Sequence, residues 1–178
     1  MTCIFLNIRY NSCMRIVLLR HGENKKGKLT SLGKRQIIMT AKQLKKFNFS
    51  LVFSSPVQRC VQSAKIVCKV LKLNFQVEEN LKERWQLTHE PQTKEEIDWW
   101  NNYMNYDFQS LLKEDCRRFM DRNFEVFKKI QAQSKKDDDV LVVAHSATSY
   151  ALLNYVLNKK SKLVWQSIGL GQYICYEL

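Results

Sequence analysis

Residues 15–22 of the chain read RIVLLRHG, a short apolar run that ends in an arginine, a histidine and a glycine. The branched apolar residues of Arg15–Leu19 predict a buried β-strand that leads directly into a loop. In that loop Gly22 allows a sharp turn and a close approach of the backbone to a ligand. The guanidinium of Arg20 can form two parallel hydrogen bonds to phosphate oxygens. The segment therefore predicts an anion-binding loop, containing His21, at the end of a buried strand.

Strand and helix patterns alternate along the rest of the chain. Apolar runs predict further strands at Leu51–Phe53, Leu73–Val77, Val140–Ala144 and Tyr173–Tyr176. Helical spacing predicts one helix that begins after Thr30, a favoured N-cap, and others at Val57–Leu71, Leu111–Ile130 and Ser146–Leu157. Nearly uniform apolar strands alternating with helices predict an α/β fold, in which a mostly parallel central sheet is covered by helices on both faces as a three-layer sandwich.

The length and composition favour one globular unit. A chain of 178 residues has the size of one compact domain, and we expect this domain to span residues 14–178. Residues 1–13 precede the first strand and are expected to be an extension; they make a poor signal peptide because they lack a basic start and a small-residue cleavage site. The chain has no run of 18 apolar residues that could cross a membrane as a helix.

The cysteines and histidines favour reduced thiols and disfavour a metal centre. The six cysteines are scattered without a CxxC pair, which is typical of structural thiols in a cytoplasmic protein. The chain also has only three histidines, too few for an evident transition-metal ligand set. We therefore expect no metal, no cofactor and a cytoplasmic location.

The net charge of +12 has two possible meanings. It can attract polyanions or acidic substrates, or it can reflect a lysine-rich surface that is simply solvated. Residues 131–139 mix both signs and predict a surface turn and not a nucleic-acid-binding tail. No basic motif with interleaved aromatic residues is present, so nucleic acid is not expected to be the main partner, and no membrane association is expected.

Two of the three histidines, His21 and His145, directly follow predicted buried strands. Ligands of mostly parallel sheets bind beyond the carboxyl ends of the strands, so both histidines are candidate site residues. Arg59 lies at a strand–helix junction, where the helix N-terminus also attracts anions. Glu83 follows the third predicted strand and is either a proton donor or, as is more common on spacing alone, a surface carboxylate.

Five segments in order resemble the histidine phosphatase superfamily, the group of phosphoglycerate mutases and related acid phosphatases. The first is similar to the family's RHG signature, and the others to its LTxxGxxQ helix start, its SPxxRxxxTA segment, its acidic segment and its second histidine. These segments are Leu19–Glu23, Leu29–Gln36, Ser55–Ala64, Leu81–Arg84 and Val142–Ser146. A single RHG tripeptide would be weak evidence, but five ordered segments covering about residues 14–178 are specific.

The resemblance implies a role for each matching residue. His21 would be the nucleophile that forms a phosphohistidine, and Glu83 would protonate the leaving oxygen. Arg20, Arg59 and His145 would bind the phosphoryl oxygens, with Ser146 beside them. The implied activity is a metal-independent phosphatase with a phosphoglycerate mutase-like fold. Its partner would be a small phosphorylated substrate or a phosphoprotein.

Departures from the family pattern leave alternatives open. Residues 24–28 lack the tryptophan–asparagine pair and the longer loop that mutases of the family carry, which favours a phosphatase over a mutase. A binding module without turnover is a further alternative. Glu83 lacks a clear glycine–tryptophan continuation, so Glu23 and Glu90 are alternative carboxylates. The aromatic segment 85–108 is either a lid over the substrate or core packing.

Overall fold

The protein is described by a computed structural model that covers residues 14–83, 94, 114–157 and 168–178. The predicted extension at residues 1–13, the aromatic segment 85–108 and the alternative carboxylate Glu90 lie outside these residues. None of the helices in the described part is long and apolar enough to cross a membrane.

A five-stranded sheet forms the centre of the described structure, with the strand order β5-β4-β6-β1-β7. The strands are β1 (Arg15–Arg20), β4 (Phe49–Ser54), β5 (Gln76–Val77), β6 (Asp139–Ala144) and β7 (Tyr173–Glu177). β1, β4, β5 and β6 pair in parallel, and only β7 runs antiparallel to its neighbour β1. The prediction of a mostly parallel sheet is confirmed.

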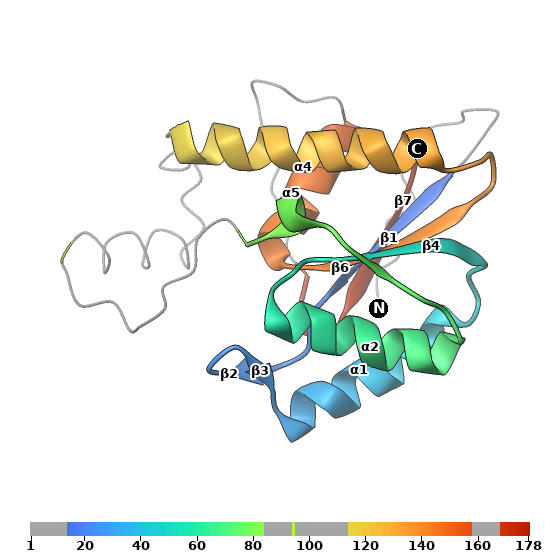
Figure 1. The fold of residues 1–178 in the computed structure, drawn as a ribbon, viewed down its shortest axis with the longest axis vertical. Coiled ribbons are helices and arrows are strands. Elements are labelled where there is room, and N and C mark those ends of the chain that lie inside the picture. Colours follow the sequence, from blue (N-terminus) through green and yellow to red (C-terminus); the bar gives the residue numbers. More distant parts are fainter. Residues whose placement is uncertain (1–13, 84–93, 95–113, 158–167) are drawn as a thin grey trace.

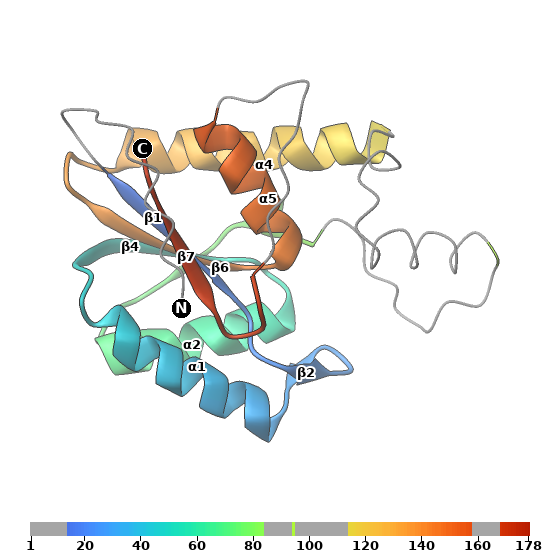
Figure 2. The same cartoon turned by 180° about the vertical axis from the view of Figure 1, so that it is seen from behind.

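Helices cover both faces of this sheet (Figures 1 and 2). On one face lie α1 (Ser31–Leu44) and α2 (Gln58–Leu71), and on the other lie α4 (Glu114–Gln133) and α5 (Ser146–Val156). Successive side chains of β1 alternate between the two cores: Val17 packs towards α1 and α2, and Leu18 packs towards α4 and α5. The three-layer arrangement is therefore the predicted one.

The main departures from the predicted elements lie at turns. The predicted strand at residues 73–77 is paired only over β5, because Lys72 adopts a left-handed φ of 57° and the N–H of Leu73 still bonds to Cys68 at the end of α2. A hairpin of β2 (Asn24–Lys25) and β3 (Lys28–Leu29) was not predicted. A 3-10 turn, η1 (Glu79–Leu81), precedes Glu83.

The backbone torsions of the β2–β3 turn explain why the sequence pattern did not predict this hairpin. Its two central residues, Lys26 and Gly27, have φ values of 50° and 77°. Positive φ at both positions is the geometry of the tight hairpin turn that follows the twist of the strands. Lysine is uncommon at such a position, so the strongest sequence signals for this turn are absent.

The loop after β1 packs directly against the start of α1, and two glycines make this contact possible. A Cβ atom on Gly22 would lie 2.5 Å from the carbonyl oxygen of Gly33, and a Cβ on Gly33 would lie 2.0 Å from the carbonyl oxygen of Glu23. The side chain of Thr30 caps α1 by accepting from the N–H of Gly33 at 3.0 Å, as predicted for its N-cap. The cap and the two glycines fix the loop that carries His21.

We expect Gly33→Ala to lower the free energy of unfolding by about 1–3 kcal/mol, because the added methyl group overlaps backbone atoms that cannot move aside. The overlap outweighs the gain of about 1 kcal/mol that alanine normally brings to a helix. Chemical denaturation measures the effect. Gly169→Ala is the control, since its Cβ would meet only the flexible side chain of Gln172. Equal stability of Gly33→Ala and the parent protein would contradict the close packing of this loop.

Candidate active site

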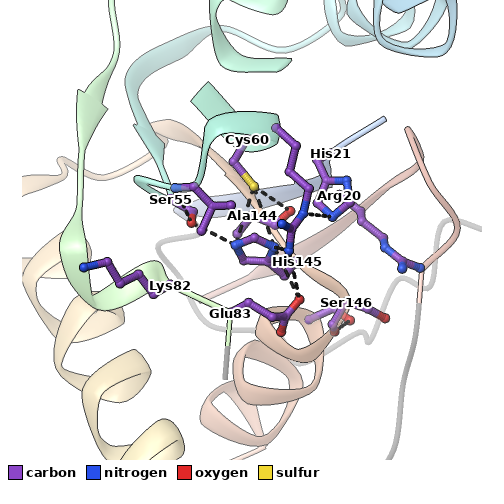
Figure 3. Close-up of polar contacts among 12 residues, drawn as sticks. Arg20, His21, Ser55, Cys60, Lys82, Glu83, Ala144, His145 and Ser146 are labelled. Atoms are coloured by element: carbon purple, nitrogen blue, oxygen red, sulfur yellow. Dashed lines mark hydrogen bonds and ion pairs between the residues drawn. The ribbon is translucent and has the colours of Figure 1, made fainter. Parts of the chain in front are cut away.

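The order of the strands brings three loop residues together at one edge of the sheet. β6 lies between β4 and β1, so the residues that follow these strands, Ser55, His145 and His21, are neighbours. Figure 3 shows the two histidine side chains near each other, with a distance of 5.5 Å between the ring centroids. The predicted convergence of His21 and His145 at the carboxyl ends of the strands is present in the structure.

His21 is held firmly by its own backbone. Its N–H donates to Ala144 at 3.1 Å and its carbonyl oxygen accepts from Gly171 at 3.0 Å, so β6 and the segment before β7 fix it from both sides. Its ring Nδ1 lies 2.8 Å from the carbonyl oxygen of Gly22, which can only accept a hydrogen bond. Nδ1 therefore carries the proton, and Nε2 carries the lone pair of the ring.

The surroundings keep the imidazole of His21 neutral. Only 4% of the residue is exposed, and burial is the main cause that lowers its pKa to about 3. The hydrogen bond to Gly22 opposes the shift, and the positive charges of Arg59 and Arg20 add to it. A neutral ring with an available Nε2 lone pair is the form that can act as a nucleophile.

Arg59 connects the two histidines to the carboxylate. Its Nε donates to His21 Nε2 at 2.9 Å, while its Nη2 lies 3.3 Å from His145 Nδ1 and 4.0 Å from Glu83 Oε2. Arg59 is the second residue of α2, and Ser63 one turn later accepts from the N–H of Gly22. The same helix thus supplies the guanidinium and supports the loop of His21.

His145 is fully buried between a hydroxyl and a carboxylate. Its Nε2 lies 2.8 Å from Ser55 Oγ, and its Nδ1 lies 3.3 Å from Glu83 Oε2. Burial is the largest cause that lowers the pKa of His145, followed by the charge of Arg59. Because the Ser55 hydroxyl can donate or accept, it satisfies either neutral tautomer of the ring. His145 can therefore carry its proton on Nδ1 when Glu83 is ionised and on Nε2 when Glu83 is protonated.

Glu83 reaches the site from a short loop that α4 holds in place. The guanidinium of Arg122 on α4 donates to the carbonyl oxygens of Asn80 and of Lys82, the latter at 2.7 Å. It also lies over the ring of Phe119, 4.7 Å from the centroid. Burial lowers the pKa of Arg122, and the charge of Glu83 raises it in opposition. Arg122 thus ties the loop of Glu83 to the helix layer on that face.

The other predicted site residues, Arg20, Ser146 and Glu23, make different contacts. Arg20 Nη1 donates to the carbonyl oxygen of Ile168 at 2.8 Å, and Figure 3 shows its guanidinium directed away from His145. Its buried Nε has no hydrogen-bond partner among the described residues. Ser146 begins α5 directly after His145 and is 8% exposed. Glu23 accepts from the hydroxyl of Thr30 at 2.8 Å, at the start of α1. The structure therefore gathers His21, Arg59, His145 and Glu83, with Arg20 at their edge.

Comparison with known proteins matches this arrangement to one family. Residues 16–173 match the histidine phosphatase superfamily (branch 1), and this range contains all of the residues just described. The chain belongs to the histidine phosphatase superfamily. The family resemblance drawn from the sequence is therefore confirmed.

Solved structures of several phosphatases show the same fold. A mycobacterial glucosyl-3-phosphoglycerate phosphatase is 21% identical, with a TM-score of 0.72 over 91% of this chain and 89% of that chain. The alpha-ribazole phosphatase from Shigella flexneri is 17% identical, with a TM-score of 0.71 over 91% and 89%. A phosphoserine phosphatase from Entamoeba histolytica, in complex with 3-phosphoglyceric acid, is 24% identical, with a TM-score of 0.58 over 82% and 80%. A search of curated protein sequences found no significant match.

Sequence reasoning missed three residues that this histidine phosphatase superfamily member places around its site. Ser55 contacts the ring of His145, Cys60 Sγ lies 3.6 Å from His145 Nε2, and Arg122 holds the loop of Glu83. Burial raises the pKa of the Cys60 thiol, which therefore stays protonated. Ser55 and Cys60 could have been found, because both belong to the segment that carries Arg59. Arg122 is remote in sequence and gave no signal.

The described residues contain no group of three or more histidine, cysteine, aspartate or glutamate side chains placed to hold a metal ion. Cys60 and Cys68 are buried free thiols. Metal independence of the histidine phosphatase-like site stays a prediction, and an experiment for it is given below.

Proposed function

We propose that the protein is a phosphatase that hydrolyses a phosphomonoester through a phosphohistidine on His21, without a metal ion. The observation that carries this proposal is the pair of hydrogen bonds made by the His21 ring, from which its tautomer follows. Its Nδ1 is occupied by the carbonyl of Gly22, while its neutral Nε2 faces Arg59. In this proposal residues 14–178 form one catalytic domain, and the cysteines, scattered without a CxxC pair, favour a cytoplasmic location.

In the first step Nε2 of His21 attacks the phosphorus atom. The N–P bond forms as the bond from phosphorus to the leaving oxygen breaks, and Glu83 gives its proton to that oxygen. The negative charge of a phosphate dianion favours the protonated form of a nearby carboxyl group, so substrate binding prepares Glu83 as the acid.

In the second step water attacks the phosphohistidine. Glu83, now a carboxylate, accepts a proton from the water, the N–P bond breaks, and Nε2 regains its lone pair as inorganic phosphate forms. His145 can change its hydrogen bonding between the two steps. Its Nδ1 donates to Glu83 when the carboxylate is charged, and it accepts from Arg59 when the carboxyl group is protonated. The hydroxyl of Ser55 satisfies the opposite nitrogen in either case.

Arg59 and Arg20 are the proposed clamps on the phosphoryl oxygens. A phosphoryl group that approaches Nε2 of His21 enters the position between the imidazole and Arg59, and the guanidinium then donates to a phosphoryl oxygen. The buried Nε of Arg20 offers a second donor. The N–H groups of the first turn of α5, beginning at Ser146, lie beside His145 and add a favourable dipole for an anion.

The proposed substrate is a small phosphorylated molecule or a phosphoprotein. The related phosphatases act, according to their names, on glucosyl-3-phosphoglycerate, alpha-ribazole phosphate and phosphoserine, and the feature common to all three is the phosphate group. A panel of sugar phosphates, nucleotides, phosphoglycerates and phosphopeptides would identify the preferred class. A requirement for a bisphosphorylated cofactor would indicate the mutase alternative instead.

We expect the purified protein to hydrolyse p-nitrophenyl phosphate, to retain that activity in a strong chelator and to be inhibited by vanadate. Vanadate adopts the five-coordinate geometry of the transition state, which the clamp residues are proposed to stabilise. Release of inorganic phosphate with and without chelator measures both effects. Loss of activity on chelation that a divalent ion restores would contradict metal independence. Absence of hydrolysis across the whole panel would contradict the proposed function.

A further inference from the structure

The positive charge of the protein is concentrated in the first half of the described chain. Residues 14–77 contain 14 of the 29 lysines and arginines but only one of the 17 acidic residues, Glu23. This stretch includes α1 and α2, which together cover one face of the sheet (Figure 1), as well as the strands β1 to β5. The rest of the chain is close to neutral. The excess positive charge of the protein therefore lies in residues 14–77.

The outer face of α1 is basic without matching carboxylates. The face consists of the exposed residues Lys34, Arg35, Ile38, Met39, Lys42 and Lys45, which recur at intervals of three and four along the helix and its C-cap. None of its four cations forms an ion pair with a described residue. On α4, in contrast, Lys128 pairs with Glu125 at 2.7 Å and Lys129 pairs with Glu78 at 2.6 Å. The cations of α1 are available to an external anion.

Apolar side chains project between these cations. Among the described residues the exposed large hydrophobic side chains are Leu32, Ile38, Met39 and Val77, and the first three belong to α1. Met39 is 64% exposed and Ile38 is 40% exposed. They do not belong to either buried core, because the inward face of α1 is formed by Ile37, Ala41 and Leu44. The neighbouring exposed side chains of Ile38 and Met39 can take part in a contact surface together with the cations around them.

We propose that the outer face of α1 docks the protein onto an anionic lipid surface, contrary to the expectation from the sequence that no membrane is a partner. Lysine and arginine ammonium and guanidinium groups attract acidic headgroups, and apolar side chains such as Ile38 and Met39 can enter the boundary between headgroups and acyl chains. A nucleic-acid duplex would use the cations alone and would gain nothing from the apolar residues. This face presents no aromatic side chain on which bases could stack. The combination of unpaired cations and exposed apolar groups therefore favours lipid.

The test is co-sedimentation of the full chain with phosphatidylcholine vesicles, with and without about one third phosphatidylserine, at low and high salt. We expect binding only to the vesicles that contain phosphatidylserine. Arg35→Glu combined with Lys42→Glu should weaken binding at least about 30-fold, the factor that corresponds to about 1 kcal/mol for each lost cation. Lys135→Glu combined with Lys136→Glu, in the loop after α4, changes the net charge equally and should bind almost as the parent does.

A second variant tests the apolar part of the surface. Ile38→Ser combined with Met39→Ser should weaken vesicle binding several-fold, while binding of a DNA duplex by the parent and by this variant should be equally weak. Thermal unfolding of each variant checks that the fold is intact, independently of any phosphatase activity. Equal losses in the two charge-reversal variants would show a response to net charge alone and overturn the proposal. Tighter binding to the duplex than to vesicles, or no vesicle binding, would also overturn it.

Discussion

His21→Ala should abolish turnover of every phosphomonoester that the parent protein hydrolyses, with a loss of about 10⁴-fold or more. The imidazole supplies the only proposed nucleophile, and its Nε2 is held neutral and oriented by the hydrogen bond from Nδ1 to Gly22. Without this ring no covalent phosphoenzyme can form at this position. Steady-state release of phosphate measures the loss.

Rapid quenching with a labelled substrate should trap a phosphoenzyme in the parent protein but not in His21→Ala. A phosphorus–nitrogen bond to imidazole is labile in acid and stable in alkali, unlike a phosphoserine ester, so the stability of the label identifies the residue type. Unchanged thermal unfolding of the variant separates loss of chemistry from loss of fold. Full activity of His21→Ala, or a label with the stability of a phosphate ester, would contradict the proposed intermediate.

Glu83→Gln should slow alkyl phosphates on the order of 10²–10⁴-fold while slowing p-nitrophenyl phosphate much less. An alkoxide is a poor leaving group that needs a proton, whereas p-nitrophenolate departs almost without help. Arg59→Ala should instead slow both esters to a similar degree, because charge on the phosphoryl oxygens needs stabilisation whichever group leaves. The two variants therefore separate proton donation from the phosphate clamp.

The comparison is best made in single-turnover experiments that follow the phosphorylation step. Glu83 is also the proposed base in dephosphorylation, and this step could limit the steady state with the activated ester. Lys82→Ala is the matched control, because the neighbouring Lys82 is largely exposed and pairs with Glu79 at 2.6 Å, away from the histidines. An equal loss for both esters in Glu83→Gln would give Glu83 a structural role. Glu23 and Glu90 would then be tested as the proton donor.

The fold was predictable from the sequence because its core strands are nearly all apolar. The apolar runs at residues 15–19 and 140–144 are typical of strands that are buried on both faces of a sheet. The helices between them show apolar residues at clear helical spacing. Elements whose geometry depends on backbone torsion were less predictable. Lys26 and Lys72 adopt positive φ without the glycine or asparagine that normally signals it. The hairpin and the shortened β5 follow from these two residues.

The candidate site was predictable to the extent that strand ends determine it. His21, Arg59 and His145 follow strands that are neighbours in the sheet, so their convergence is a property of topology. The position of Glu83 was harder to predict, because it depends on hydrogen bonds from Arg122, about forty residues away, to carbonyl groups that any sequence would have. A backbone acceptor leaves no signature in the sequence.

The hydrogen bond from Arg59 to Nε2 of His21 also decides which molecules can react with this histidine. The same lone pair that would attack phosphorus is covered by a cationic N–H at 2.9 Å. A neutral acylating or alkylating reagent offers Arg59 no alternative partner and must break this bond without compensation. A phosphate oxyanion offers a stronger acceptor and draws the guanidinium aside. Arg59 thus keeps the Nε2 lone pair of His21 from neutral electrophiles and makes it available to anions.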